Sequence, residues 1–134
     1  MKDQTPLASV LAPETLREID LYLEEFYSQS VKAGNEMARA GLRTTQIRGL
    51  ETLVTSASRF SEIINYIKNQ AGKDKKGKWL KIASLFLEQL EQIEHKSNEM
   101  SRGNPEAALE IKMKLARGWA KQVVAHYLYS ALQR

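Results

Sequence analysis

NPEAALEIKMKLARGWAKQVVAHYLYSAL, residues 104–132, carries the clearest structural signal in the chain. It opens with an asparagine suited to a helix N-cap, a proline suited to the first turn, and the acidic Glu106 at the positive end of the helix dipole. Apolar side chains then recur at helical spacing, at Met113, Ala116, Ala120, Val123, Tyr127 and Ala131. The pattern predicts a helix from Pro105 to near Leu132 whose apolar face is part of a core rather than a cofactor pocket.

A second long helix is predicted near the N-terminus. Pro13 is a good first-turn residue because it has no amide hydrogen to leave unpaired. Gly41 suits the end of the helix, because glycine adopts the left-handed conformation of a C-cap at little cost. Gly34 lies inside this stretch and either belongs to the helix or divides it. Apolar residues follow helical spacing at Leu16, Ile19, Leu23, Phe26, Ala33, Met37 and Ala40.

Two more helices are predicted between these. One begins with a cap at Thr44 or Thr45 and continues to residues 71–72, because its apolar stripe from Ile47 to Ile67 shows no interruption. The lysine-rich connection KDKKGK, residues 73–78, follows it. The other helix runs from Trp79 to residues 102–103 along a stripe of isoleucine, phenylalanine and leucine.

These elements define the expected fold class. No segment alternates apolar and polar residues between hairpin turns, and the breaks are only about three to six residues long. With 134 residues, the chain has the size of one domain. We therefore expect an all-α protein, an elongated bundle of four to five helices, with one domain over residues 13–134 and a disordered or weakly ordered N-terminus over residues 1–12.

The composition indicates the compartment. The chain has no cysteine, which excludes disulfides and thiolate chemistry and suits a reducing compartment. No run of roughly 18 apolar residues is present, and the N-terminal stretch does not have the form of a signal peptide. We expect a cytoplasmic protein that does not enter a membrane.

Signs of catalysis are missing from the sequence. His95 and His126 lie on different predicted helices, outside any metal-ligand spacing. The seven glycines form no phosphate-binding loop, and the acids among leucines are typical of solvated helix faces. We expect no enzyme activity, no metal, no cofactor and no small-molecule substrate.

Charge is unevenly distributed along the chain, although the formal net charge is only +4. Residues 1–36 carry 3 bases and 7 acids, and residues 82–110 carry 2 bases and 6 acids. Residues 37–81 carry 10 bases and 3 acids, and residues 111–134 carry 5 bases and no acid. Two basic blocks thus alternate with two acidic ones, which suggests one surface for a polyanion and others for basic partners or solvent.

Two basic helix faces are candidates for contact with a sugar–phosphate backbone, because arginine grips phosphate bidentately and threonine donates to its oxygens. On the helix predicted from Thr44, helical spacing places Arg48 and Arg59 on one side with small hydroxyl residues between them. On the last helix, one side carries Lys114, Arg117 and Lys121. The alternatives are a merely solvated face for the first and charge complementary to the helix dipole for the second.

A third basic element is the lysine run itself, Lys73, Lys75, Lys76, Lys78 and Lys81. It is either a phosphate clamp or a solubilising connection, and the connection is slightly favoured. Trp79, next to it, suits base stacking in principle, but its place at the start of an apolar stripe favours core packing.

Two segments resemble a known family. GLRTTQIRGL, residues 41–50, resembles the threonine-glutamine-isoleucine-arginine motif that opens a helix in the small subunit of type III-A (Csm) CRISPR effector complexes. WAKQVVAHYLYSAL, residues 119–132, resembles the closing helix of that family. The middle of the chain departs from the family pattern, which leaves a small subunit of type I-D or type III-D as an alternative.

The resemblance implies a non-catalytic subunit, present in several copies, that stacks beside the backbone subunits and helps to hold guide RNA and target. By this resemblance Thr45, Gln46 and Arg48 match the motif, with Arg48 as the foremost phosphate contact. The helical-face argument adds Arg43, Arg59, Lys114, Arg117 and Lys121. The expected partners are CRISPR guide RNA and target nucleic acid, other effector subunits and further copies of the chain.

A competing interpretation comes from the acidic blocks. The chain is then a helical adaptor or scaffold that binds another protein and no nucleic acid, with its acidic first and third predicted helices docked on a basic surface. Binding to unrelated RNA sequences and its dependence on salt separate the two interpretations.

Overall fold

The computed structural model describes residues 11–132, and in that range the chain forms five α-helices and no strand. Their bounds are α1 Pro13–Ala40, α2 Thr44–Ser56, α3 Phe60–Lys73, α4 Lys78–Ser101 and α5 Pro105–Leu132. The predicted all-α bundle is confirmed. Of the N-terminal segment expected to lack order, residues 1–10 lie outside the described residues, whereas Leu11 is buried in the core.

The predicted ends of the first, third and last helices agree with the structure within about two residues, the usual uncertainty of a helix boundary. α1 ends where Gly41 adopts the left-handed conformation, with φ at 84°. α1 also continues unbroken through Gly34, so the alternative of a division there is wrong.

The helix expected over residues 44–72 is divided in two, which corrects the prediction. Ala57 is extended, with φ −67° and ψ 141°, and Ser58 and Arg59 connect α2 to α3. The Ser56 hydroxyl donates to the Thr52 carbonyl, a local bond that competes with helix continuation. At the start of α3, the Glu62 carboxylate accepts from the Ser58 amide. The apolar stripe continues across the break because both helices face the same core.

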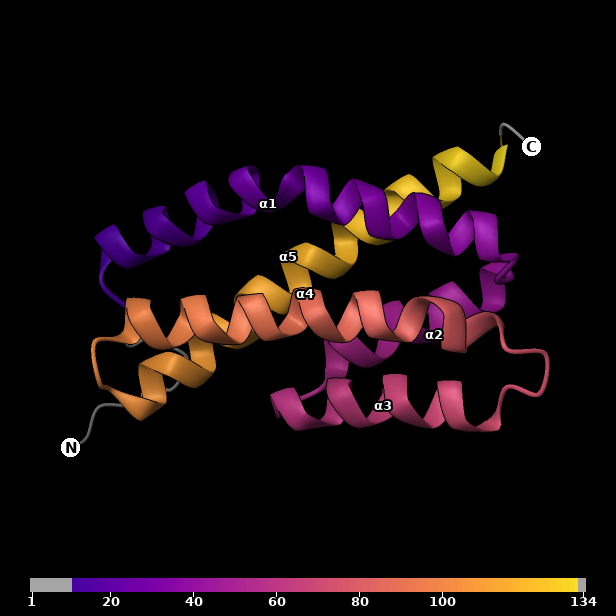
Figure 1. Ribbon diagram of the computed structural model, residues 1–134. Coiled ribbons are helices and arrows are strands. Elements are labelled where there is room, and N and C mark those ends of the chain that lie inside the picture. The colour runs from indigo at the N-terminus through magenta and orange to yellow at the C-terminus, as the bar shows by residue number, and fades with distance from the viewer. Residues whose placement is uncertain (1–10, 133–134) are drawn as a thin grey trace.

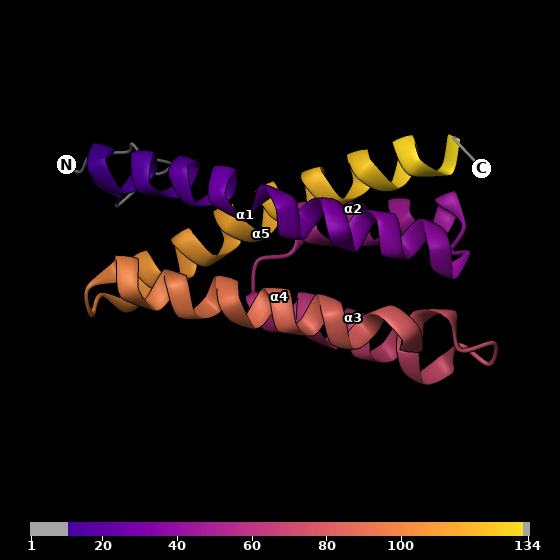
Figure 2. The ribbon, with the colours of Figure 1, turned by 45° about the horizontal axis from the view of Figure 1, so that its top comes forward.

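α5 is the central element of the bundle. It crosses obliquely between α1 and α4, while α2 and α3 complete the packing near one end (Figures 1 and 2). Its middle is buried on several sides, with Ile111, Leu115, Ala116, Trp119 and Val123 all fully buried. A helix that is apolar nearly all round has to be surrounded by others, which explains the dense apolar composition of residues 107–127.

Two buried networks join the helices. The Trp119 indole N–H donates to Gln89 Oε1 at 2.8 Å, and Gln89 Nε2 donates to the Gln29 carbonyl at 2.8 Å, so α5, α4 and α1 are linked in series. Edge-to-face aromatic contacts connect Tyr66 to Trp79, Trp79 to Phe86 and Phe86 to Trp119, with centroids 5.5–6.2 Å apart. This geometry is favourable for aromatic rings, and the series carries the core from α3 through α4 to α5.

Gly34 marks a close approach of the α1 backbone to the α5 backbone. A Cβ added there would lie 2.6 Å from the Val123 carbonyl oxygen and 2.8 Å from the Tyr127 amide nitrogen. Both atoms belong to the α5 backbone, so neither can move aside without shifting the helix. Gly72 on α3 has nothing within 4 Å of the same position.

We predict opposite effects for Gly34→Ala and Gly72→Ala, measured by chemical denaturation. Gly34→Ala lowers the free energy of unfolding by about 1–3 kcal/mol, because it forces α1 away from α5. Gly72→Ala raises it by up to about 1 kcal/mol, because alanine favours the helix and meets no obstacle. Equal effects of the two substitutions would contradict the α1–α5 packing described above.

Candidate nucleic-acid interface

A groove lies where α2 begins, α3 ends and α4 begins. It has a volume of about 470 Å³, and the side chains that argue for a ligand are Arg43, Gln46, Lys73, Lys75, Lys76 and Lys78. We call it the basic groove. Five cationic side chains line it, against one acid, Asp74. The groove therefore joins two predicted elements, the start of the Thr-Gln-Ile-Arg segment and the lysine run.

The start of α2 is held by a side chain of its own first turn. Gln46 Oε1 accepts a hydrogen bond from the Arg43 amide at 2.7 Å, and Arg43 is the N-cap residue. The prediction of a cap at Thr44 or Thr45 is wrong, because both residues lie inside the first turn, exposed. Gln46 thus has a structural role that also fixes the backbone from which the Arg43 side chain extends.

The lysine run is shaped by Asp74. Its carboxylate accepts from the Trp79 amide at 2.7 Å and from the Lys76 amide at 3.1 Å. The hydrogen bond from Trp79 is the main cause of the lowered pKa of Asp74, with further contributions from the Lys76 and Lys78 amides. The one acid of the groove is therefore bonded to the backbone of the turn, while Lys75 and Lys76 stay exposed.

Lys78 and Trp79 connect the groove to the core. Lys78 Nζ donates to the Gly41 carbonyl at 3.2 Å, so the start of α4 is tied to the end of α1. Trp79 is only 1% exposed, and its ring packs edge-to-face with Tyr66 and Phe86. Core packing, the favoured interpretation of Trp79, is confirmed, and its ring offers no free face on which a base could stack.

Arg48 and Arg59 do not share one helix face. Arg48 lies on α2, where its guanidinium pairs with Glu51 at 2.8 Å, and its side chain is 54% exposed. Arg59 is the N-cap residue of α3 and pairs with Glu62 at 3.2 Å. The predicted face is wrong for Arg59, because the chain changes direction at Ala57. Exposed ion pairs of this kind are weak, so both guanidiniums remain accessible to a phosphate.

Arg117 is half-buried and bonded to the backbone, whereas the predicted basic face of the last helix placed it in solvent. Its Nη2 donates to the Ala57 carbonyl at 3.2 Å, which holds the α2–α3 break against α5. Its buried Nε has no hydrogen-bond acceptor among the described residues. Lys121 is exposed and Lys114 is half-buried on the same helix. None of the three lines the basic groove.

Of the eight predicted contacts, the structure thus brings Arg43 and Gln46 into one groove and leaves Thr45 and Arg48 nearby on α2. The prediction missed Gln70 and gave the lysines of the connection no place among the contacts. The spacing of these lysines could be taken from the sequence. Their position beside Arg43 could not, because α3 runs back along α2 and brings its end to the start of α2.

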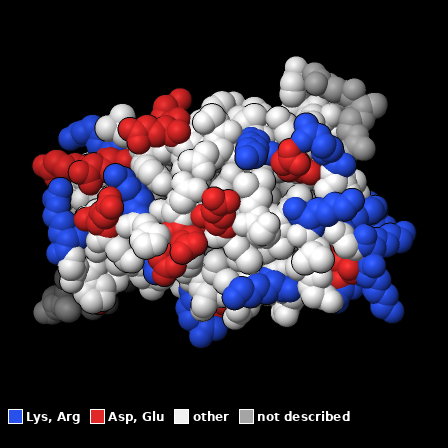
Figure 3. All heavy atoms as spheres, in the orientation of Figure 1, with Lys and Arg blue, Asp and Glu red and all other residues white. Residues whose placement is uncertain are grey.

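The charges are unevenly distributed over the surface. Figure 3 shows many Lys and Arg at the end where the α3–α4 connection lies, and most Asp and Glu over the rest of that view, where further Lys and Arg lie among them. The field at the first end favours a polyanion.

The described residues contain no group of three or more histidine and acidic side chains placed to hold a metal ion. His126 shares a 2.7 Å hydrogen bond with the Tyr27 hydroxyl, and His95 is exposed on α4. Within residues 11–132, no helix combines the length and apolar composition needed to cross a membrane. No family model, curated protein or solved structure matches this chain.

We predict that Arg117→Ala lowers the free energy of unfolding by about 1–3 kcal/mol, because it leaves the Ala57 carbonyl without its donor. Lys121→Ala, a cationic residue one turn further along α5, changes it by less than about 0.5 kcal/mol. Thermal and chemical denaturation measure both. If Arg117→Ala is as stable as Lys121→Ala, the contact with Ala57 does not support the α2–α3 break.

The lowered pKa of Asp74 predicts a pH-dependent contribution to stability. Because the folded pKa lies below the unfolded value, ionised Asp74 stabilises the fold above its ordinary pKa of 3.8 and stops doing so as the pH falls through the folded pKa. Asp74→Asn is therefore less stable than the unaltered protein at pH 7, and the difference shrinks as the pH falls below 3.8. Chemical denaturation of both proteins across this pH range tests the prediction. A stability difference that stays constant with pH would contradict the role given to ionised Asp74.

Proposed function

We propose that this protein is a non-catalytic, RNA-binding small subunit of a multi-subunit CRISPR ribonucleoprotein effector. It holds the sugar–phosphate backbone of guide or target RNA without sequence preference and stacks with other copies and subunits in the effector filament. The observation that carries the RNA-binding part is the basic groove, in which Arg43 and Gln46 lie together with the lysines of the α3–α4 connection.

The chemistry of the groove favours a phosphate backbone. The Arg43 guanidinium presents a planar set of donors that matches phosphate oxygens, and lysines 73, 75 and 76 act as compact charges around it. Asp74 is the one acid among five cations, and its carboxylate is engaged by backbone amides, so the groove keeps a net positive charge. No exposed aromatic ring lines the groove, which favours backbone contact over base recognition.

The assignment to a CRISPR effector is supported by the resemblance of residues 41–50 and 119–132 to the type III-A small subunit. Arg43 and Gln46 belong to the first of these segments and line the groove, while Thr45 and Arg48 are exposed on the same helix. Sequence selection in such an assembly comes from guide pairing, and the protein contacts backbone and shape.

The size of the groove implies weak binding by one subunit. Few phosphates can contact so small a surface, and each contact contributes a modest, salt-dependent part of the affinity. Repeated copies along a filament multiply these contacts, because each later copy binds at high effective concentration.

We predict that Lys75→Ala/Lys76→Ala weakens binding to polyuridylate and lowers the slope of log affinity against log salt by about 1.4, roughly 0.7 for each lost contact on single-stranded RNA. Both residues are exposed in the connection, so the fold is preserved. Arg17→Ala/Lys32→Ala, which removes the same charge from exposed positions on α1, leaves the slope unchanged. Fluorescence anisotropy over a salt series measures both.

Equal slopes for the two double variants would show that the groove does not hold the RNA. Variants that keep their RNA affinity and salt slope but no longer enter the native complex would favour the protein-binding adaptor instead. The CRISPR assignment is tested separately. A tagged copy purified from the native host is expected to co-purify with CRISPR proteins and a discrete guide RNA.

A further inference from the structure

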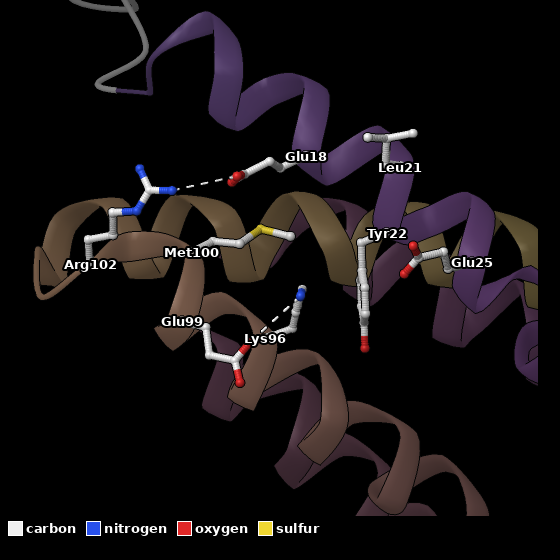
Figure 4. Close-up of a pocket in the computed structure, with 8 residues that line it drawn as sticks. All are labelled: Glu18, Leu21, Tyr22, Glu25, Lys96, Glu99, Met100 and Arg102. Carbon is white, nitrogen blue, oxygen red and sulfur yellow. Dashed lines mark ion pairs between the residues drawn. The ribbon is translucent and has the colours of Figure 1, made fainter.

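A second cleft lies between α1 and α4, toward the opposite end of α4 from the basic groove. It has a volume of about 260 Å³, and Tyr22, Glu25, Lys96, Glu99 and Met100 are among its lining side chains. Figure 4 shows the Tyr22 ring extending from α1 toward α4, with Lys96 and Glu99 on the α4 side. We call it the acidic cleft, because acids outnumber bases along its lining by three to two.

The chemistry of the acidic cleft suits a cation. The Lys96 ammonium lies 5.6 Å from the centre of the Tyr22 ring and 3.7 Å from Glu99 Oε1, so an aromatic face and a carboxylate already hold one positive charge there. A second ion pair joins Arg102 Nη2 to Glu18 Oε2 at 3.7 Å. Glu25 makes no ion pair among the described residues. Burial raises the pKa of the Tyr22 hydroxyl, and the charges of Glu25 and Glu99 raise it further.

An apolar component accompanies this charge. Leu21 is 62% exposed at the edge of the cleft, and Met100 is buried within the lining. Leu21, Tyr22 and Met100 form an apolar part of a lining whose other five side chains are charged, so the cleft can contact an apolar side chain as well as a cation. The acids Asp20 and Glu24 on α1 are also exposed, beside the exposed base Arg17, so acids exceed bases in the surroundings of the cleft as they do in its lining. An excess of acid attracts basic groups.

We infer that the acidic cleft is a docking site for a basic segment of another protein. The segment places an arginine or lysine beside Glu25 and Tyr22 and an apolar side chain against Leu21 and Met100. Charge complementarity selects this occupant, because Glu25 is the carboxylate that the cleft's own cations leave unpaired. The inference goes beyond the RNA-binding proposal and uses none of its residues.

The full chain is tested with a labelled synthetic peptide that carries arginine on one face of a helix and leucine on the other. We expect the peptide to bind, and a version with glutamate in place of arginine not to bind. Glu25→Gln and Leu21→Ala each weaken binding about tenfold, the effect of losing one central contact. Amide shifts in NMR spectra are expected at Tyr22, Glu25 and Glu99.

Two matched variants serve as controls. Leu80→Ala removes a leucine that is 66% exposed on the same helix as Met100 but outside the cleft. Glu88→Gln removes one charge from an exposed position of α4 that does not line the cleft. Both are expected to bind the peptide as the unaltered protein does. All four variants should keep the helical circular dichroism spectrum, because each altered side chain is exposed.

Three results would overturn the inference. If the cleft variants and their controls lose the same amount of peptide affinity, the peptide is held by general charge attraction. If the NMR amide shifts are confined to residues 73–78, the peptide binds outside the acidic cleft. A change of sedimentation of the protein alone in Glu25→Gln or Leu21→Ala would show that a second copy of the chain is the occupant. The cleft variants are expected to bind polyuridylate as the unaltered protein does. A negative result for the peptide therefore leaves the RNA-binding proposal standing, and a negative result for RNA leaves this inference standing.

Discussion

The hydrogen-bonded series from Trp119 through Gln89 to the Gln29 carbonyl is the interaction on which the arrangement of the bundle depends. Apolar packing alone tolerates a helix sliding or rotating along its neighbours, whereas a buried amide left without partners costs about 1–3 kcal/mol. Only one register of α5, α4 and α1 gives the indole and the Gln89 amide their partners. The aromatic series that ends at Trp119 extends the same register to α3.

This register places the two charged surfaces at opposite ends of α4. The start of α4 is tied to the end of α1 by Lys78 and Gly41, and there the lysines surround the basic groove. The end of α4 lies against the first half of α1, where Arg102 pairs with Glu18 beside the acidic cleft. The proposed function assigns RNA to the end with the basic groove, and the separate inference assigns a basic protein segment to the end with the acidic cleft.

The helices themselves were largely predictable, and the exception has a physical reason. α1 and α4 have long 3.6-residue stripes, α5 is a long apolar stretch, and proline or glycine lies at or next to their ends, so sequence alone locates all three. The break at Ala57 was missed because Val54 and Phe60, on either side of it, face the same core and continue the stripe. The hydroxyl residues Ser56 and Ser58 were the available signal, since such side chains compete for backbone hydrogen bonds.

The sequence by itself determined the all-α class, most helix ends, the segregation of charge and the burial of Trp79. Only the tertiary structure decided which charges meet. α2 and α3 have 13 and 14 residues and run in opposite directions, so the break that was missed brings Arg43 beside Lys73. Packing also decided the place of Arg117, because a helical wheel shows which residues share a side but not how many neighbouring helices cover it. α5 is covered on several sides, so a guanidinium expected in solvent instead donates to the Ala57 carbonyl.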